Sequence, residues 1–108
     1  MAVSSLFDLP EALPPQELFE PIVAGHGVLI ERIVSVGHET PEGEWYDQER
    51  DEWVAVLQGE AVLAYADGRA LELKAGDHVL IPAHQRHRVA RTSTAPPCIW
   101  LAVHGDLT

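Results

Sequence analysis

Two short stretches concentrate the side chains that could bind a ligand or move a proton. Residues 43–59 hold aromatic rings, an amide and several carboxylates between two glycines. Residues 76–89 supply imidazoles, which the first stretch lacks. Carboxylates and imidazoles are common acids, bases and metal ligands. We therefore expect the two stretches to form the two halves of one site.

Strand alternation would point several of these polar groups into an apolar interior. If 53–58 is a strand, Glu52 lies on the same side as two valines, while Tyr46 shares a face with Gln48. His87 in turn shares a face with a valine. A buried carboxylate or imidazole needs a partner, and a divalent cation can serve several at once. The pattern predicts a metal site, and its oxygen and nitrogen donors would suit zinc, iron, manganese or nickel alike.

The elements that must position these groups are short strands. From residue 28 onward, β-prone runs alternate with glycine and aspartate turns. Asp67-Gly68 predicts a type I′ hairpin turn. No segment has sustained helical periodicity, so we expect an all-β sandwich or barrel. The predicted strands are 28–36, 45–47, 53–58, 60–66, 69–73, 78–81, 87–92 and 99–103.

Residues 1–27 are predicted to form an N-terminal arm on a barrel domain of residues 28–108. Four of the eight prolines fall in this segment, which rules out one long helix or strand. Residues 16–20 could form one helical turn closed by Pro21. We expect the arm to pack its apolar side chains onto the barrel, namely Leu6, Phe7, Leu9, Leu18 and Phe19.

Composition limits the function classes. A chain of 108 residues that is 46% hydrophobic suits one folded domain. The formal charge of -10 argues against nucleic acid as a partner. No apolar run could cross a membrane and no signal peptide is recognisable, so we expect a cytoplasmic protein. The single cysteine, Cys98, is read as a buried structural thiol, with a reactive thiol as the alternative.

The two stretches resemble the two motifs of the cupin superfamily, G-x5-H-x-H-x3,4-E-x6-G and G-x5-P-x-G-x2-H-x3-N. Glu52, six further residues and Gly59 match the end of the first motif. Gly76, five further residues, Pro82 and then His87 match the second. The resemblance covers about residues 43–91 and implies a single-domain cupin β-barrel of jelly-roll type.

This resemblance also implies a set of site residues. Glu52 and His87 stand at metal-ligand positions, and Gln48 and His84 are further candidate metal ligands. Tyr46 and Gln48 occupy the places of the two first-motif histidines, while His84 replaces the second-motif glycine and Arg91 its asparagine. Tyr46 would then act as a catalytic proton donor or contact the substrate.

Other polar residues are given simpler roles. His38 could replace a missing ligand, although a loop histidine is the preferred interpretation, and Asp47 would turn inward if the strand phase shifted by one residue. We expect the remaining acids of residues 39–51, Asp51 included, to be solvated. His26, His78 and His104 are taken as structural or exposed. The arginines of the second stretch are expected to neutralise the acidic loop, or alternatively to hold a substrate carboxylate; they are Arg86, Arg88 and Arg91.

The resemblance implies two functions of different classes. The first is a metal-dependent enzyme, of oxygenase or isomerase type, acting on a small organic molecule. The second is a non-catalytic module that binds or senses a small ligand. Both faces of the 53–58 strand are apolar, so its outer face needs a cover, and a homodimer is the simplest one.

Overall fold

The computed structural model describes residues 2–108, and these form eight strands and no helix. The all-β prediction is therefore confirmed. No helix of the described chain is long and apolar enough to cross a membrane. The strands are β1 Leu18–Gly25, β2 Val28–Ser35, β3 Asp51–Gln58, β4 Glu60–Tyr65, β5 Ala70–Lys74, β6 His78–Ile81, β7 His87–Thr92 and β8 Cys98–Gly105.

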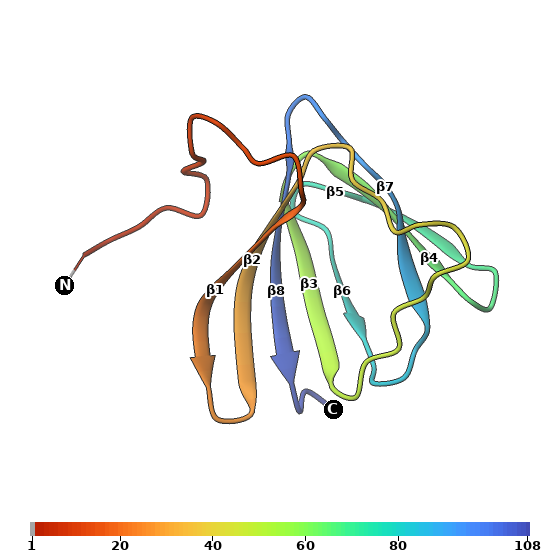
Figure 1. Cartoon of the computed structure of the whole chain (residues 1–108). Coiled ribbons are helices and arrows are strands. Elements are labelled where there is room, and N and C mark those ends of the chain that lie inside the picture. Colours follow the sequence, from red (N-terminus) through yellow and green to blue (C-terminus); the bar gives the residue numbers. More distant parts are fainter. Residues whose placement is uncertain (1) are drawn as a thin grey trace.

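The strands form two antiparallel sheets that face each other. One sheet has the order β1-β2-β8-β3-β6, and the other has the order β5-β4-β7. Figure 1 shows the small sheet leaning over one side of the large one, so that the two enclose a common interior. This is the barrel that the regular spacing of short strands predicted.

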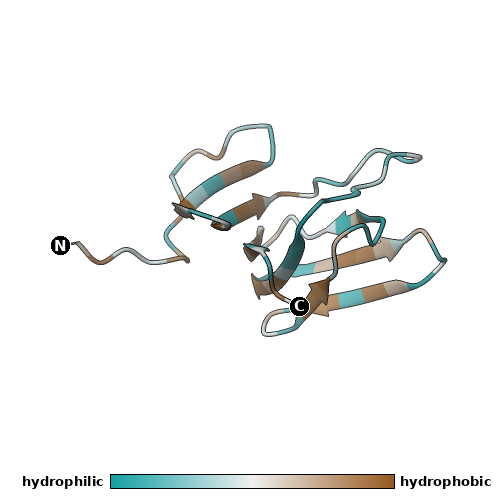
Figure 2. Ribbon diagram, turned by 90° about the horizontal axis from the view of Figure 1, so that it is seen from below, coloured by the Kyte–Doolittle hydropathy of each residue, from teal (hydrophilic) through white to brown (hydrophobic). Residues whose placement is uncertain are grey.

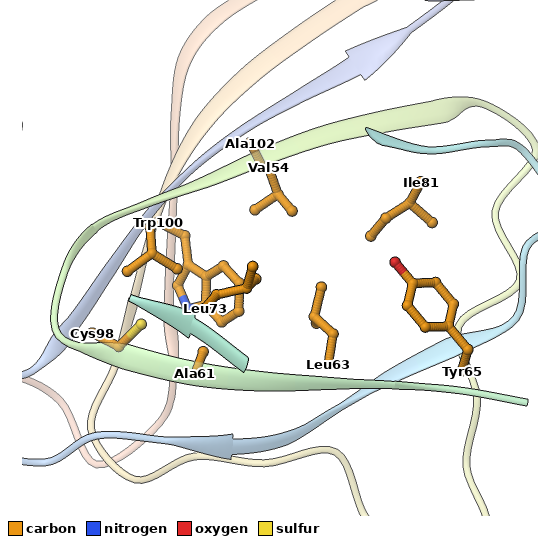
Figure 3. Close-up of a cluster of buried hydrophobic side chains, with 10 residues drawn as sticks. Val54, Ala61, Leu63, Tyr65, Leu73, Ile81, Cys98, Trp100 and Ala102 are labelled. Atoms are coloured by element: carbon orange, nitrogen blue, oxygen red, sulfur yellow. The ribbon is translucent and has the colours of Figure 1, made fainter. Parts of the chain in front are cut away.

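Side-chain alternation decides what fills that interior. On β3, Glu52, Val54 and Val56 are 8%, 3% and 0% exposed, and all three face inward as predicted. Figure 3 shows Val54 from the large sheet and Leu63 from the small sheet pointing toward each other. Along the strands apolar residues are interrupted by polar ones, as the alternating colours of Figure 2 show. The buried cluster comprises Val54, Val56, Ala61, Leu63, Tyr65, Leu73, Ile81, Cys98, Trp100 and Ala102.

The sheet begins within the segment that was expected to form the arm. The predicted helical turn at residues 16–20 is wrong, because Leu18–Gly25 pairs with β2 as an edge strand. The pairing shifts register between Pro21 and Val23, and a proline without an N–H is tolerated at such an edge. Pairing with the free edge of β2 thus outweighs the propensity of residues 16–20 for a helical turn.

The segment before β1 leaves the barrel at that edge (Figure 1). It is held partly by Arg32, whose Nη1 donates to the carbonyl oxygens of Leu6 and Asp8 at 3.0 and 2.6 Å. Phe7 is 57% exposed, so the prediction that it packs onto the barrel is wrong. Phe19 is also half exposed, because it lies on the edge strand.

The hairpin between β4 and β5 differs from the predicted type I′ turn. Such a turn needs positive φ at both central residues, but only Gly68, at 97°, has one. The amide of Gly68 donates to the carbonyl of Tyr65, so the central residues are Ala66 and Asp67. The carboxylate of Asp67 accepts bonds from the amide and Nε of Arg69, which stabilises this alternative.

Candidate functional site

The segment before β3 crosses one end of the barrel and is tied to β7 by a single backbone bridge. The amide of Tyr46 donates to the carbonyl of His87 at 2.7 Å, and the His87 amide donates back at 3.1 Å. The strand predicted at 45–47 is thus reduced to one bridged residue. The bridge brings the two polar stretches of the sequence together, as predicted.

A half-open cavity of about 80 Å³ lies beneath this bridge, between the two sheets. Apolar side chains form most of its wall, including Leu63 from the small sheet and Trp100 from the large one. The polar side chains that line it are Glu17, Glu31, Tyr46, Gln48, Glu52, His87 and His104. Four of the five site residues expected from the sequence therefore share one cavity.

Glu52 and His87 face each other across this cavity from opposite sheets. Glu52 Oε1 lies 3.7 Å from His87 Nε2, which is an ion-pair distance and too long for a hydrogen bond. The other ring nitrogen, Nδ1, lies 2.8 Å from the carbonyl oxygen of Gln85, which fixes the ring and leaves Nε2 free. Burial by itself would lower the pKa of His87, but the Glu52 carboxylate and the Gln85 carbonyl outweigh it and raise that pKa.

Three further polar cavity residues, Glu17, Glu31 and His104, were not found from the sequence. His104 Nε2 lies 3.0 Å from Glu31 Oε1 and 3.8 Å from Glu52 Oε2. His104 was expected to be structural or exposed, and it lines the cavity because β3 pairs with β8 and sets Glu52 directly opposite it. The available signal was alternation: Glu31 shares a face with Ile33, and His104 shares one with Trp100.

Tyr46 covers the imidazole of His87. The two rings are stacked with centroids 5.6 Å apart, and Tyr46 is 41% exposed. Burial, followed by the negative charge of Glu17, raises the pKa of the Tyr46 phenol. The phenol therefore stays protonated at neutral pH, as a proton donor requires.

His84 is the predicted ligand that the structure keeps apart from the others. It lies outside the cavity lining, with Nδ1 2.8 Å from Asp47 Oδ1 and both side chains at least half exposed. Its amide donates to the carbonyl of Gln48 at 2.8 Å. His84 has a φ of 64°, the left-handed conformation that the motif's glycine would adopt easily. It connects the two stretches at the surface.

His38 and Asp51 both have structural roles. His38 Nδ1 accepts a bond from the Val36 amide, and its Nε2 lies 2.7 Å from the Pro15 carbonyl oxygen. The expectation that Asp51 is solvated is wrong, because it is only 6% exposed. Its carboxylate accepts hydrogen bonds from the amide of Ala83, which follows β6, and from the amide of Leu107, near the end of the chain. These bonds tie both segments to β3.

The three arginines of the second stretch lie away from the cavity. The Arg86 guanidinium stands 5.8 Å from the ring centre of Trp45, and Arg88 donates to the carbonyl of Thr40 at 3.1 Å. Arg91 pairs loosely with Glu60 at 3.7 Å on the surface. Two of them thus hold the loop before β3 through an aromatic ring and a backbone oxygen.

The cavity has the donor types of a transition-metal site, since imidazole Nε2 atoms and carboxylate oxygens suit zinc, iron, manganese and nickel. Within residues 2–108, however, no three histidine, cysteine, aspartate or glutamate side chains are arranged to hold a metal ion. The donors form three successive pairs instead, Glu31 with His104, His104 with Glu52, and Glu52 with His87. Glu52 and His87 fit a metal by their chemistry, and the structure shows no complete shell.

Comparison with known proteins identifies the family. Residues 32–104 match the model of the cupin domain. A crystal structure of a provisionally named mannose-6-phosphate isomerase from Ralstonia eutropha is 41% identical, with a TM-score of 0.91 over 98% of this chain and 99% of that one. No curated protein matches the chain significantly.

Two more distant structures share the fold. A cupin superfamily protein from Desulfitobacterium hafniense is 22% identical, with a TM-score of 0.74 over 90% of this chain and 84% of that one. A protein with a double-stranded beta-helix domain from Klebsiella pneumoniae is 18% identical, with a TM-score of 0.76 over 97% and 90% of the two chains. The family match and the 41% identity together show that this chain belongs to the cupin superfamily.

Proposed function

We propose that this chain is a metal-binding cupin that acts on a small organic molecule in the cavity between its sheets. The observation that carries the proposal is the pairing of Glu52 and His87. Two different sheets bring these largely buried side chains to within 3.7 Å of each other in one half-open cavity. Burying an acid and an imidazole costs stability, and titratable pairs of this kind in a cavity are candidates for a functional site. The reaction would be of isomerase or oxygenase type, and the likeness to the Ralstonia protein favours an isomerase.

The residues divide into two groups by what they would do. Glu52 and His87 would hold a divalent transition metal ion, and Gln48, which lines the same cavity, would be a further ligand. When bound, such an ion would polarise a carbonyl or hydroxyl of the substrate. Tyr46, with its phenol protonated, would donate a proton at the cavity mouth. His84 is left out of the proposed ligand set, since it lies at the surface.

Elemental analysis of protein purified without chelator tests the metal. We expect near-stoichiometric zinc, iron, manganese or nickel in the wild type and much less in Glu52→Ala and His87→Ala. His84→Ala serves as the matched control, because it removes an imidazole from the same stretch without touching the cavity. Wild-type protein that lacks metal would refute the metal-dependent function.

The alternative function is a cupin module that binds a small ligand without turnover. The specific observation in its favour is that the described residues gather no three metal-ligating side chains, with Tyr46 and Gln48 standing where the family motif has histidines. A substrate panel separates the two proposals. Saturable binding without any turnover, in protein of known metal content, would favour the binding module.

We also propose that the chain is a homodimer. On the outer face of the large sheet Trp53 pairs with Leu80 across neighbouring strands, and Leu80 is 39% exposed. Ile22 on the same sheet is 48% exposed. An apolar face of this kind is usually covered by a partner. Size-exclusion chromatography with light scattering would contradict the proposal by showing a monomer of 11.9 kDa.

A further inference from the structure

His104 comes from the last strand, outside both polar stretches of the sequence, and stands directly opposite Glu52. The pairing of β3 with β8, two inner strands of the large sheet, makes these residues cross-strand partners. Such partners have Cβ atoms about 5 Å apart and project from the same face of the sheet. The Asp51 carboxylate, which accepts the Leu107 amide, also ties the chain after β8 to the start of β3. The backbone therefore sets the approach of His104 to Glu52.

The Glu52 carboxylate faces two imidazole nitrogens at a distance that is too long for direct bonding. Its Oε1 lies 3.7 Å from His87 Nε2, and its Oε2 lies 3.8 Å from His104 Nε2. Both distances exceed the length of a hydrogen bond. Two ligands that are each about 2.1 Å from one ion in tetrahedral geometry stand roughly 3.4 Å apart. The observed separations are within about 0.4 Å of that value, so they suit donors on either side of an ion.

These three side chains form a donor set that metal ions use. Glu52, His87 and His104 have side chains that are 10%, 5% and 13% exposed. They belong to β3, β7 and β8, so both sheets contribute. Two imidazoles and one carboxylate recur in catalytic zinc and non-haem iron sites, which keep a position open for water or substrate. The half-open cavity leaves room for such a position.

The residues at the places of the two first-motif histidines are weaker ligands. The Tyr46 ring is stacked on the His87 ring with centroids 5.6 Å apart, whereas a metal binds an imidazole at the edge that carries the ring nitrogen. The amide of Gln48 is an oxygen donor, and zinc and iron prefer an imidazole. His104 thus offers, from a different strand, the kind of donor that the first motif has at these places.

A complete shell requires rotations of Glu52 and His104. Within residues 2–108 no three side chains are arranged to hold one ion, and the two imidazoles face different oxygens of Glu52. His104 Nε2 also lies 3.0 Å from Glu31 Oε1. The terminal torsion of a glutamate is broad, so the Glu52 carboxylate can turn at low cost. His104 Nε2 can serve either Glu31 or an ion, so its ligation leaves Glu31 outside the shell.

We propose that His104 is the third protein ligand of the metal ion, with Glu52 and His87, and that β8 thereby supplies an imidazole that the first cupin motif lacks in this chain. The inference rests on the proposed function in taking the cavity as a metal site. It adds a ligand from outside both cupin motifs and gives the site two imidazoles.

The test adds one equivalent of zinc to protein that a chelator has stripped of metal. Competition with a chromophoric chelator gives the Kd for zinc, and X-ray absorption at the zinc edge gives the number of imidazole ligands. We expect two imidazoles in the wild type and one in His104→Ala. Losing a group that only supports a ligand costs about 10–100-fold in metal affinity, so losing a ligand should raise the Kd about 100-fold or more.

Two variants separate ligation from a structural role. Glu31→Ala breaks the Glu31–His104 pair but leaves His104 in place, so it should keep two imidazole ligands and a Kd within about 10-fold of the wild type. If His104 served only as the partner of Glu31, Glu31→Ala and His104→Ala would weaken zinc binding equally. His84→Ala removes an imidazole from outside the cavity lining and should leave the Kd unchanged. Amide NMR spectra of the same samples show whether each variant is folded.

Three results would overturn the inference: fewer than two imidazoles in the wild type, an unchanged Kd in His104→Ala, or equal weakening in Glu31→Ala and His104→Ala. The wild-type count holds even if a variant does not fold. Zinc bound without His104 would refute this inference alone and leave the proposed metal binding standing. Wild-type protein that takes up no zinc would refute both. Zinc bound through His104 without turnover would uphold the inference and favour the binding module.

Discussion

Gly59, which separates β3 from β4, is the position where one added methyl group should do most harm. Its φ is 81°, in the left-handed region that side chains other than glycine avoid. A Cβ built there would collide with Ser93 Oγ and lie 3.0 Å from Cys98 Cα and 3.1 Å from the Pro97 carbonyl oxygen. The last two are backbone atoms, which cannot rotate away. We predict that Gly59→Ala destabilises the fold strongly.

Gly43→Ala separates the two causes of that loss. Gly43 has a similar φ of 86°, but a Cβ there meets no atom within 4 Å. The left-handed conformation costs an alanine roughly 1–2 kcal/mol, of which about 0.4–1 kcal/mol is regained through the less flexible unfolded chain. Gly43→Ala should therefore lose roughly 0–1.6 kcal/mol. Crowding adds roughly 1–3 kcal/mol, so Gly59→Ala should lose roughly 1–4.6 kcal/mol.

Urea unfolding followed by tryptophan fluorescence measures both losses. Since each kcal/mol lowers the Tm of a domain of this size by about 4 °C, thermal unfolding should show Gly59→Ala several degrees below Gly43→Ala. Equal stability losses in the two variants would refute the reasoning, because they would mean that Ser93, Pro97 and Cys98 can move away from the added methyl group without a loss of stability. The cupin motif's glycine would then have only a conformational role.

Three further predictions concern ionisable groups. In metal-free protein, NMR titration should give His87 a pKa above its ordinary value, and Glu52→Gln should lower that pKa below it, because burial then dominates; no change in the variant would contradict the ion pair. Hydrogen bonds from the Ala83 and Leu107 amides lower the pKa of Asp51, so its ionised form stabilises the fold above its unfolded pKa of about 4. That stability should be lost as the pH falls through the lower folded pKa, and urea unfolding at a series of pH values should show a shallower acid loss in Asp51→Asn. Burial raises the pKa of Cys98 to about 12, so the thiol should resist a maleimide at pH 8 in folded protein and react in urea, and fast labelling of folded protein would contradict its burial.

The local sequence pattern predicted most of the strands and two of the cavity residues, Glu52 and His87. Alternation along 52–56 placed Glu52 on the buried face with Val54 and Val56, and the structure agrees. The resemblance of Gly76, Pro82 and His87 to the second cupin motif marked the imidazole that faces Glu52. These features were predictable because a strand's faces and a turn's glycines depend on neighbouring residues alone.

Long-range pairing explains what the sequence did not predict. Leu18–Gly25 became a strand because β2 offered a free edge, although its own residues also suited a helical turn. His84 points away from the cavity because its backbone adopts a left-handed conformation and its ring meets Asp47. Neither result follows from the local sequence.

The sequence by itself determined the all-β class, the cupin resemblance and the inward direction of Glu52 and His87. Only the tertiary structure decided that Glu31 and His104 join them and that the arginines stay outside the cavity. The physical reason is register: β3 pairs with β8, and β8 with β2, which sets side chains from distant parts of the chain next to one another. The pairing of Glu31 with His104, and the approach of His104 to Glu52, follow from that register.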